Sequence, residues 1–352
     1  MITIRELLVM AKDRNASDVH ITVGVPPKCR VNGDLIELGA PIVQPKDTEA
    51  LVMRMMDAKQ KKVLEEKGEV DFSYAEPQVG RYRVNVYQQR GTLAAAIRLV
   101  GTTIPTPDQL GLPPSVVEVT NKKRGLVLVT GPTGSGKSTT LASLINIINQ
   151  TYNSHIITLE DPIEYLHTHG KAIVNQREVG NDTNSFGNAL RAALRQDPDV
   201  ILVGEMRDLD TISIAVTAAE TGHLVFSTLH TIGAASTIDR IIDVFPPHQQ
   251  QQIRIQLASV LECIVSQQLI PTANGRGRVA AFEVMHANSA IRNLIREAKA
   301  HQIMSIMQTN KKIGMQTMDD AIYDLYSKRI IDSEKAISFA QDPMGLSRKV
   351  LV

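Results

Sequence analysis

The chain has 352 residues, of which 43% are hydrophobic and 21% charged, and its formal net charge is +1. This length is sufficient for two domains with separate hydrophobic cores, and the balanced charge excludes a global electrostatic attraction to nucleic acid or to an anionic membrane. The two cysteines, Cys29 and Cys263, lie far apart and in no metal-ligand spacing, so neither a disulfide framework nor a zinc site follows from them.

The first hundred residues predict a mixed antiparallel α+β domain. Residues 2–12 are typical of an amphipathic helix rather than a signal peptide, and no apolar run approaches the roughly 18 residues of a membrane span, so we expect a cytosolic protein. A second helix is predicted over residues 47–67, and Asn32-Gly33 is typical of a hairpin turn. Strands are predicted over residues 18–22, 27–31, 34–38, 71–74, 80–87 and 93–99.

Three arginines lie at strand-compatible positions of this domain: Arg81, Arg83 and Arg98. Arg81 and Arg83 are two residues apart and therefore share one face of their strand. Two interpretations stay open. The side chains form a solvated strand face, or they reach a nucleotide across a domain or subunit boundary, as trans arginine fingers do.

A segment with four prolines and two glycines, residues 101–114, is the predicted linker. After it, strands and helices alternate as in a mostly parallel α/β sheet, and the pattern turns helical after about residue 280. The predicted organisation is therefore a first domain over residues 1–100, a linker over 101–114 and a second domain over 115–352.

A predicted strand over residues 125–130 is followed by Gly-Pro-Thr-Gly-Ser-Gly-Lys-Ser, which matches the phosphate-binding pattern G-x-x-x-x-G-K-[ST]. The glycines let the loop curl so that backbone N–H groups point at phosphate oxygens. Lys137 is expected to reach the β- and γ-phosphates, and the Ser138 hydroxyl to ligate Mg²⁺. The predicted cofactors are ATP and Mg²⁺. The predicted nucleotide-binding residues are Gly131, Pro132, Thr133, Gly134, Ser135, Gly136, Lys137, Ser138 and Thr139.

Two other apolar strands end in carboxylates. One leads to Glu205, and in ATPases a carboxylate at that strand end lies near Mg²⁺ and the attacking water. The other leads to Glu160, Asp161 and Glu164, which can bind the metal through water or act as a general base if this strand neighbours that of the phosphate loop. The alternatives are an exposed strand-end acid and an acidic turn broken by Pro162. We predict Glu205 and Glu164 as catalytic residues and Asp161 as a metal ligand.

A third strand lies between His223 and His230. A neutral histidine at a strand end can hydrogen-bond the γ-phosphate and sense its hydrolysis, whereas a lone histidine is more often structural. We predict that His230, which follows the strand, is the functional one of the two.

Together these motifs resemble the secretion ATPase superfamily of type II and IV secretion and of type IV pili. In that family's order, the phosphate loop is similar to Walker A, residues 159–164 to the Asp box, 194–208 to Walker B and 221–231 to the His box. Residues 16–22 and 26–33 are similar to its N-terminal signature. Residues 290–297, Ala-Ile-Arg-Asn-Leu-Ile-Arg-Glu, are similar to a motif specific to the retraction ATPases of the PilT family.

The resemblance implies an α/β protein with a PAS-like α+β N-terminal domain, a RecA-like P-loop ATPase domain with a helical C-terminal part, and assembly into a homo-hexamer. It places the three arginines near the γ-phosphate between the domains. Glu205 matches the Walker B glutamate and Glu164 that of the Asp box, and which of them polarises water stays open. The implied function is ATP-driven removal of pilin from the fibre base, which retracts type IV pili and powers twitching motility.

The implied location is the cytoplasmic face of the inner membrane at the pilus base, without direct membrane insertion. The implied partner is the inner-membrane pilus platform protein, a second retraction ATPase is a further candidate, and no nucleic acid is expected. Extension ATPases of the PilB type are longer at the N-terminus and usually carry a four-cysteine zinc site, so the resemblance favours retraction. The alternatives are a PilU-like accessory ATPase, an extension ATPase, a DNA-transport ATPase and a nucleotide-gated scaffold. An aromatic content of 4% counts against DNA transport.

Within residues 290–297, Ile291, Leu294 and Ile295 share one helix face, and Arg292 and Arg296 lie four residues apart on another. The spacing alone predicts a packed helix with a solvated basic edge. The resemblance implies that the segment couples hydrolysis to retraction.

Overall fold

The computed structural model describes residues 2–31, 33–101 and 103–350. The chain forms two compact units. The first holds the residues up to Thr103 together with Glu164–Leu166, and the second holds Ile104–Ile163 together with the residues from His167 onward. Within the described residues, no helix combines the length and the apolar character that crossing a membrane requires.

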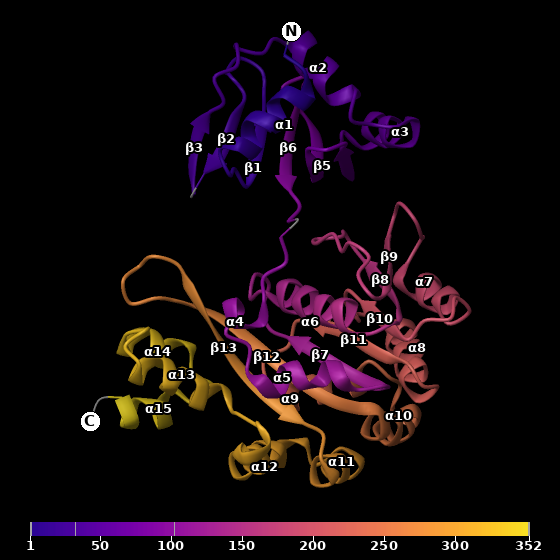
Figure 1. Cartoon of the computed structure of the whole chain (residues 1–352), viewed down its shortest axis with the longest axis vertical. Helices are drawn as coiled ribbons and strands as arrows, with labels where there is room; N and C mark the ends of the chain where they lie inside the picture. Colours follow the sequence, from indigo (N-terminus) through magenta and orange to yellow (C-terminus); the bar gives the residue numbers. More distant parts are fainter. Residues whose placement is uncertain (1, 32, 102, 351–352) are drawn as a thin grey trace. The chain divides into compact units, whose positions relative to one another are not determined.

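The first unit is built on a six-stranded antiparallel sheet in the order β3-β2-β1-β6-β5-β4. Its strands are β1 (Asp18–Ile21), β2 (Lys28–Val31), β3 (Asp34–Glu37), β4 (Glu69–Glu76), β5 (Gly80–Gln89) and β6 (Thr92–Leu99). Its helices are α1 (Ile4–Asp13), α2 (Pro45–Met53) and α3 (Ala58–Lys67), and Figure 1 shows α1 against the sheet. The hairpin between β2 and β3 is present, although Asn32 of the predicted turn lies outside the described residues.

The core of this unit follows from the alternation of side chains along its strands. Tyr82, Val84 and Val86 of β5 are buried together with Leu7 and Leu8 of α1. The intervening residues of β5 point to the other face of the sheet, which is the face that carries the arginines.

The single helix predicted over residues 47–67 is wrong, because α2 and α3 are separate. The Asp57 carboxylate accepts a hydrogen bond from the Gln60 amide (2.8 Å), and Gln60 Oε1 accepts one from the Asp57 amide (2.9 Å). This capping box starts a new helix at Ala58. Met55 and Met56 lie in the turn before it and are buried in the core.

The second unit contains a seven-stranded sheet in the order β13-β12-β7-β11-β10-β8-β9, in which only β13 is antiparallel to its neighbour. Its strands are β7 (Gly125–Thr130), β8 (His155–Glu160), β9 (Ile173–Glu178), β10 (Val200–Val203), β11 (Leu224–Leu229), β12 (Leu261–Pro271) and β13 (Arg278–His286). The mostly parallel sheet predicted for this part of the chain is therefore confirmed.

Helices cover both faces of this sheet, as a parallel sheet requires. Leu126 and Leu128 of β7 belong to one hydrophobic cluster, and Val127 and Val129 belong to a second one on the opposite face. The helices are α4 (Pro107–Leu110), α5 (Pro114–Val117), α6 (Lys137–Thr151), α7 (Phe186–Ala193), α8 (Leu209–Glu220), α9 (Ala234–Asp243), α10 (Pro247–Val260), α11 (Ser289–Arg296), α12 (Ile303–Thr309), α13 (Met318–Ser327), α14 (Ser333–Phe339) and α15 (Pro343–Val350). Short 3₁₀ turns lie at Glu118–Asn121, Ala300–Gln302 and Lys311–Ile313.

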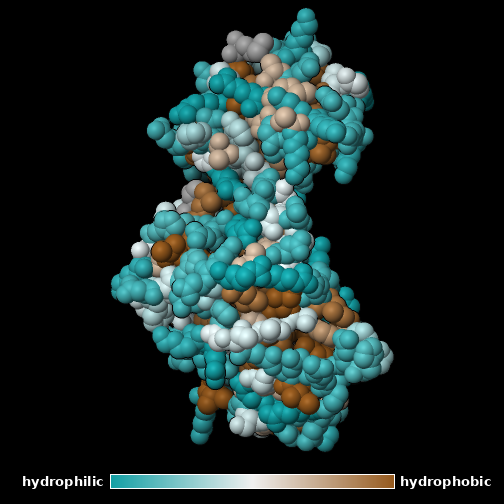
Figure 2. All heavy atoms as spheres, turned by 90° about the vertical axis from the view of Figure 1, so that its right-hand side faces the viewer, coloured by the Kyte–Doolittle hydropathy of each residue, from teal (hydrophilic) through white to brown (hydrophobic). Residues whose placement is uncertain are grey.

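The change to purely helical structure comes at Ser289 rather than near residue 280, because β13 continues to His286. Figure 1 shows α13, α14 and α15, in yellow, beside β13, where they share a hydrophobic cluster that includes Ala281, Met318 and Leu346. Figure 2 shows that hydrophilic side chains cover most of the visible surface of the second unit, and that apolar atoms reach it in a band across the middle.

Candidate active site

The predicted phosphate loop joins β7 to α6 and has a backbone that only glycine adopts easily. Gly131, Gly134 and Gly136 have φ angles of 142°, 77° and 90°. A Cβ added at Gly131 would lie 2.2 Å from the backbone carbonyl oxygen of Gln267, so no side chain fits there. The positive φ angle therefore favours glycine at all three positions, and at Gly131 there is also no room for a side chain.

The loop presents hydrogen-bond donors toward its own interior. The Lys137 ammonium donates to the carbonyl oxygens of Gly131 (2.9 Å) and Pro132 (3.1 Å), and α6 begins at this residue, so the positive end of the helix faces the loop. The Ser135 hydroxyl is buried and has no hydrogen-bond partner within the part of the chain that the structure describes. An ammonium, a helix N-terminus and an unsatisfied hydroxyl in one loop fit the phosphates of a nucleotide.

The predicted magnesium ligands are one loop hydroxyl and one carboxylate. Within the described ranges, no group of three or more His, Cys, Asp or Glu side chains could hold a metal ion. ATPases hold Mg²⁺ with a loop hydroxyl, one carboxylate and the phosphates themselves. Ser138, the second residue of α6, has such a hydroxyl, and Asp161, directly after β8, has a carboxylate. Their role as metal ligands stays a prediction.

Three of the predicted residues meet at the edge of the sheet where the parallel strands end. His230 follows β11, and its ring lies between the phosphate loop and the Walker B carboxylate. Its Nδ1 is 3.5 Å from the Thr133 hydroxyl, and its Nε2 is 3.5 Å from Glu205 Oε2. The same carboxylate oxygen accepts from Arg207 Nε at 2.7 Å. Residues that follow β7, β10 and β11 are thus combined into one site.

The acidic residues Glu160, Asp161 and Glu164 were predicted to act at the phosphates only if their strand, β8, lies next to β7. In the sheet, β11 and β10 separate β8 from β7, so the condition that β8 neighbours the strand of the phosphate loop is not met. Glu160 Oε1 accepts hydrogen bonds from the Thr158 hydroxyl (2.6 Å) and from Gln176 Nε2 (3.1 Å). Glu164 belongs to the first compact unit, and its catalytic role stays a prediction.

The three arginines share the outer face of the first unit's sheet. Arg83 and Arg98 are direct cross-strand partners in β5 and β6, and Arg81 lies two residues from Arg83 on the same face. Opposed like charges destabilise a sheet unless they are compensated. Asp71 pairs with Arg83 at 3.0 Å and Asp18 with Arg98 at 2.8 Å. Their predicted role toward a nucleotide stays a prediction.

A model of the family described as "Type II/IV secretion system protein" matches residues 2–336. The chain belongs to this family. It is 49% identical over 340 residues to a Pseudomonas aeruginosa protein named type IV pilus retractation ATPase PilT, with 97% of this chain and 98% of that protein covered. It is 41% identical over 341 residues to the type IV pilus ATPase PilU of the same species, with 97% and 89% covered.

Solved structures agree with this placement in the secretion family. The crystal structure of the pilus retraction motor PilT with bound ADP has a TM-score of 0.93 and 52% identity, and 99% of this chain and 100% of that chain are covered. The ATPase DotB of Legionella pneumophila has a TM-score of 0.83 and 30% identity, with 95% of each chain covered. The predicted fold class, an α+β N-terminal domain followed by a RecA-like ATPase domain, is confirmed.

Gln267 supports the phosphate loop, and the sequence analysis did not predict this role. Gln267 of β12 is 3% exposed, and its side chain bridges two parts of the site. Its Nε2 donates to the Ser135 carbonyl oxygen at 2.5 Å, and its Oε1 accepts from the Thr140 hydroxyl of α6 at 2.8 Å. The sequence feature that could have indicated this role is the polar run Ser266-Gln267-Gln268 inside a mostly apolar strand.

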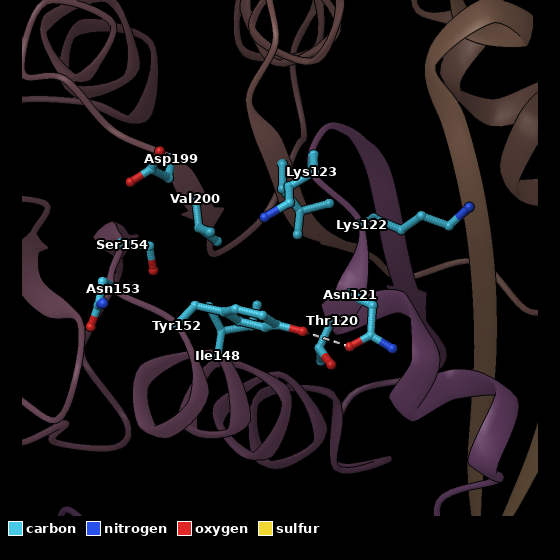
Figure 3. A pocket seen from close by; sticks show the side chains of 11 residues that line it. Thr120, Asn121, Lys122, Lys123, Ile148, Tyr152, Asn153, Ser154, Asp199 and Val200 are labelled. Atoms are coloured by element: carbon cyan, nitrogen blue, oxygen red, sulfur yellow. Dashed lines mark hydrogen bonds between the residues drawn. The ribbon is translucent and has the colours of Figure 1, made fainter.

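His223 is not part of the site. It precedes β11 at the opposite edge of the sheet, and its Nδ1 lies 2.8 Å from the carbonyl oxygen of Ala218. A cavity of about 200 Å³ lies at this opposite edge, where Val200 and Leu224 begin β10 and β11. Figure 3 shows the Tyr152 ring in it, with its hydroxyl donating to Asn121. This cavity is therefore separate from the phosphate loop.

Proposed function

We propose that this chain is an ATP-hydrolysing motor that powers retraction of type IV pili. The observation that carries the proposal is the position of His230 between Thr133 of the phosphate loop and Glu205 of the Walker B strand. A phosphate-binding loop, a carboxylate for the attacking water and a side chain that reads the γ-phosphate are the parts that ATP hydrolysis coupled to motion requires.

Each residue has a distinct role in this proposal. Lys137 neutralises negative charge on the transferred phosphoryl group, and Gln267 holds the loop in place by binding the Ser135 carbonyl. Glu205 orients and activates the attacking water, and His230 hydrogen-bonds the γ-phosphate and registers its departure. Ser138 and Asp161 would hold Mg²⁺, which would supply charge neutralisation at the phosphate oxygens.

Retraction rather than extension is favoured by the extent of the similarity. The relative named PilT is matched over nearly its whole length, whereas a type IV pilus assembly ATPase PilB of Acinetobacter baylyi is 38% identical over 251 residues, or 42% of that protein. The accessory ATPase PilU is the nearer alternative. The motor is proposed to act as a homo-hexamer at the cytoplasmic face of the inner membrane, against the pilus platform protein, with a second retraction ATPase as a candidate partner.

Steady-state hydrolysis separates this function from its alternatives. The purified chain is expected to hydrolyse many ATP molecules per subunit, without stimulation by DNA. At most one turnover per subunit would establish the nucleotide-gated scaffold instead. Strong stimulation by single-stranded DNA would establish a DNA-transport motor.

Arg83→Ala is expected to lower kcat for ATP by about 10²- to 10³-fold, because an arginine that stabilises transferred phosphoryl charge is worth at least that much in ATPases. Arg5→Ala is the matched control. Arg5 also pairs with an acid at 3.0 Å, and its side chain is 49% exposed against 48% for Arg83. An equal effect of the two variants on kcat would mean that Arg83 belongs to a solvated strand face and does not act on the nucleotide.

A mixture tests whether Arg83 acts between subunits. In rings of Arg83→Ala and Lys137→Ala subunits, some sites combine an intact loop from one subunit with an intact arginine from its neighbour. Hydrolysis by the mixture is therefore expected to exceed that of either variant alone. No recovery in rings that are shown to be mixed would place the arginine and the nucleotide in the same subunit.

The two arginines of α11 have different surroundings. Arg296 is exposed, as expected, but Arg292 does not lie on a solvated edge. Its guanidinium donates to the carbonyl oxygens of Ala287 (2.9 Å), Ala258 (2.7 Å) and Ser259 (2.8 Å) and to Glu262 Oε1 (2.8 Å). Arg292 therefore fastens α11 to the end of α10 and to the start of β12.

Arg292→Ala is accordingly expected to lower Tm by roughly 5–10 °C, because several charge-assisted hydrogen bonds are lost from a partly buried site. Arg296→Ala is expected to leave Tm and ATP turnover unchanged and to impair twitching, since its side chain is free to contact a partner. Thermal unfolding, ATP hydrolysis and colony spreading measure the three properties. Normal twitching with Arg296→Ala would remove α11 from the coupling role.

A further inference from the structure

The segment Thr231–Gly233, which we name the sensor loop, joins His230 to the first turn of α9. Its end is held by buried contacts. The Gly233 amide donates to the Ser266 hydroxyl at 2.9 Å, and the Ala234 amide donates to Glu283 Oε1 at 2.7 Å. Ser266 and Glu283 are directly opposite each other in the register of β12 and β13, so they form one cross-strand pair aimed at the start of α9.

Glu283 is a carboxylic acid inside the protein, with 1% of its surface exposed. Burial raises its pKa, and the hydrogen bonds from Ala234 and Gln341 oppose this shift. A buried carboxylate is costly unless every oxygen is bound, and the start of a helix is where its charge is best accommodated. Its position requires an explanation, because none of the proposed catalytic steps uses it.

The second oxygen of Glu283 leads to a different part of the unit. Its Oε2 accepts from Gln341 Nε2 at 3.1 Å, and Gln341 lies in the connection between α14 and α15. The amides of Gln341 and Asp342 donate to the two carboxylate oxygens of Asp319 on α13, at 2.7 and 2.9 Å. One carboxylate is therefore shared between the sensor loop and the C-terminal helices.

The sensor loop has room to move beside this carboxylate. A cavity of about 300 Å³ adjoins it, lined by Ile232 of the loop and by Met304 and Met307 of α12. Unbranched methionine side chains repack readily when a neighbour shifts. Gln341 lines the same cavity and packs closely against the loop, since a Cβ added at Gly233 would lie 3.3 Å from Gln341 Nε2. A displacement of the loop is thus absorbed by the cavity and felt by Gln341.

We propose that Glu283 is a positioning residue that transmits the nucleotide state sensed by His230 to helices α13–α15 through Gln341. The inference rests on the proposed function, because it takes His230 as the group that reads the γ-phosphate. When the sensor loop moves, the bond from Ala234 to the shared carboxylate changes, and with it the bond from Gln341. The C-terminal helices then have two positions that the nucleotide selects.

The test is amide hydrogen exchange of the full chain, with a non-hydrolysable ATP analogue or with ADP bound. Peptides covering residues 334–346 are expected to exchange about threefold or more faster in one nucleotide state than in the other. Gln341→Ala, at an exposed residue, is expected to reduce this difference to less than about 1.5-fold while KM for ATP stays within about twofold. Glu283→Gln, which keeps the shape of the side chain, is expected to weaken the difference as well.

Gln268→Ala is the matched control. The Gln268 side chain donates to the Phe339 carbonyl at 3.3 Å, so it contacts the same C-terminal segment, and among the described residues no hydrogen bond joins it to the sensor loop. This variant is expected to retain the nucleotide-dependent difference. Equal behaviour of the Gln341 and Gln268 variants, or no difference in the wild-type protein, would overturn the inference. Absence of ATP hydrolysis by the wild-type protein would instead overturn the proposed function.

Discussion

Replacing Lys137 with alanine is expected to lower ATP hydrolysis by at least about 10³-fold, the largest effect of any single substitution considered. Lys137 is 9% exposed, and its ammonium is already directed into the loop, where it donates to the carbonyl oxygens of Gly131 and Pro132. In a site with little solvent, loss of one preorganised positive group opposite a developing negative charge costs about 3–4 kcal/mol. Loss of affinity for the triphosphate adds to this effect.

Hydrolysis at saturating ATP, together with Tm measured without nucleotide, separates a damaged site from an unfolded protein. Lys171→Ala is a suitable control, because Lys171 also donates to a backbone carbonyl, that of Thr151 at 3.4 Å, but it is exposed and remote from the loop. Its activity is expected to equal that of the wild-type protein. Near-normal turnover in the folded Lys137 variant would refute the assignment of the nucleotide site.

Glu205→Gln is expected to bind ATP with nearly unchanged affinity and to hydrolyse it about 10²- to 10³-fold more slowly. The amide keeps the size of the side chain but cannot accept a proton from the attacking water. The side chain lies 3.5 Å from His230 and is 18% exposed, so the substitution leaves the sheet and the phosphate loop in place. The expected signature is a lower kcat with little change in Kd for ATP.

The same measurement on Glu164→Gln decides which glutamate polarises the water. A larger loss of kcat with Glu205→Gln assigns that role to the Walker B residue. If Glu205→Gln retained its kcat and Glu164→Gln lost it, the role would pass to the Asp-box glutamate, and Glu205 would serve only to hold His230 and Arg207.

Local patterns predicted the nucleotide motifs because each of them lies within a few residues of a strand end. The phosphate loop, Glu205 and His230 come together because parallel strands bring their carboxyl ends to one edge, and that rule does not depend on strand order. The order itself depends on pairing between distant segments. For this reason the sequence left open whether β8 lies beside β7, and the fold places β10 and β11 between them.

Residues that support the site could not be predicted from local patterns, because their contacts join segments that are distant in the sequence. Gln267 reaches the phosphate loop from β12, far along the chain, and only the fold brings the two together. The spacing of Arg292 and Arg296 indicated one basic helix edge. In the structure Arg292 instead donates hydrogen bonds to carbonyl groups at the end of α10. The break between α2 and α3, in contrast, was readable, since Asp57 and Gln60 have the spacing of a capping box.

Deletion of the gene in its own organism tests most directly whether the motor retracts pili or extends them. Surface pili are counted by electron microscopy, and twitching is measured on the same cells, with the wild-type gene and the Lys137→Ala variant as complementing controls. Retraction predicts abundant pili without twitching, restored by the wild-type gene and not by the variant. Cells without pili would contradict the account and would identify an extension motor.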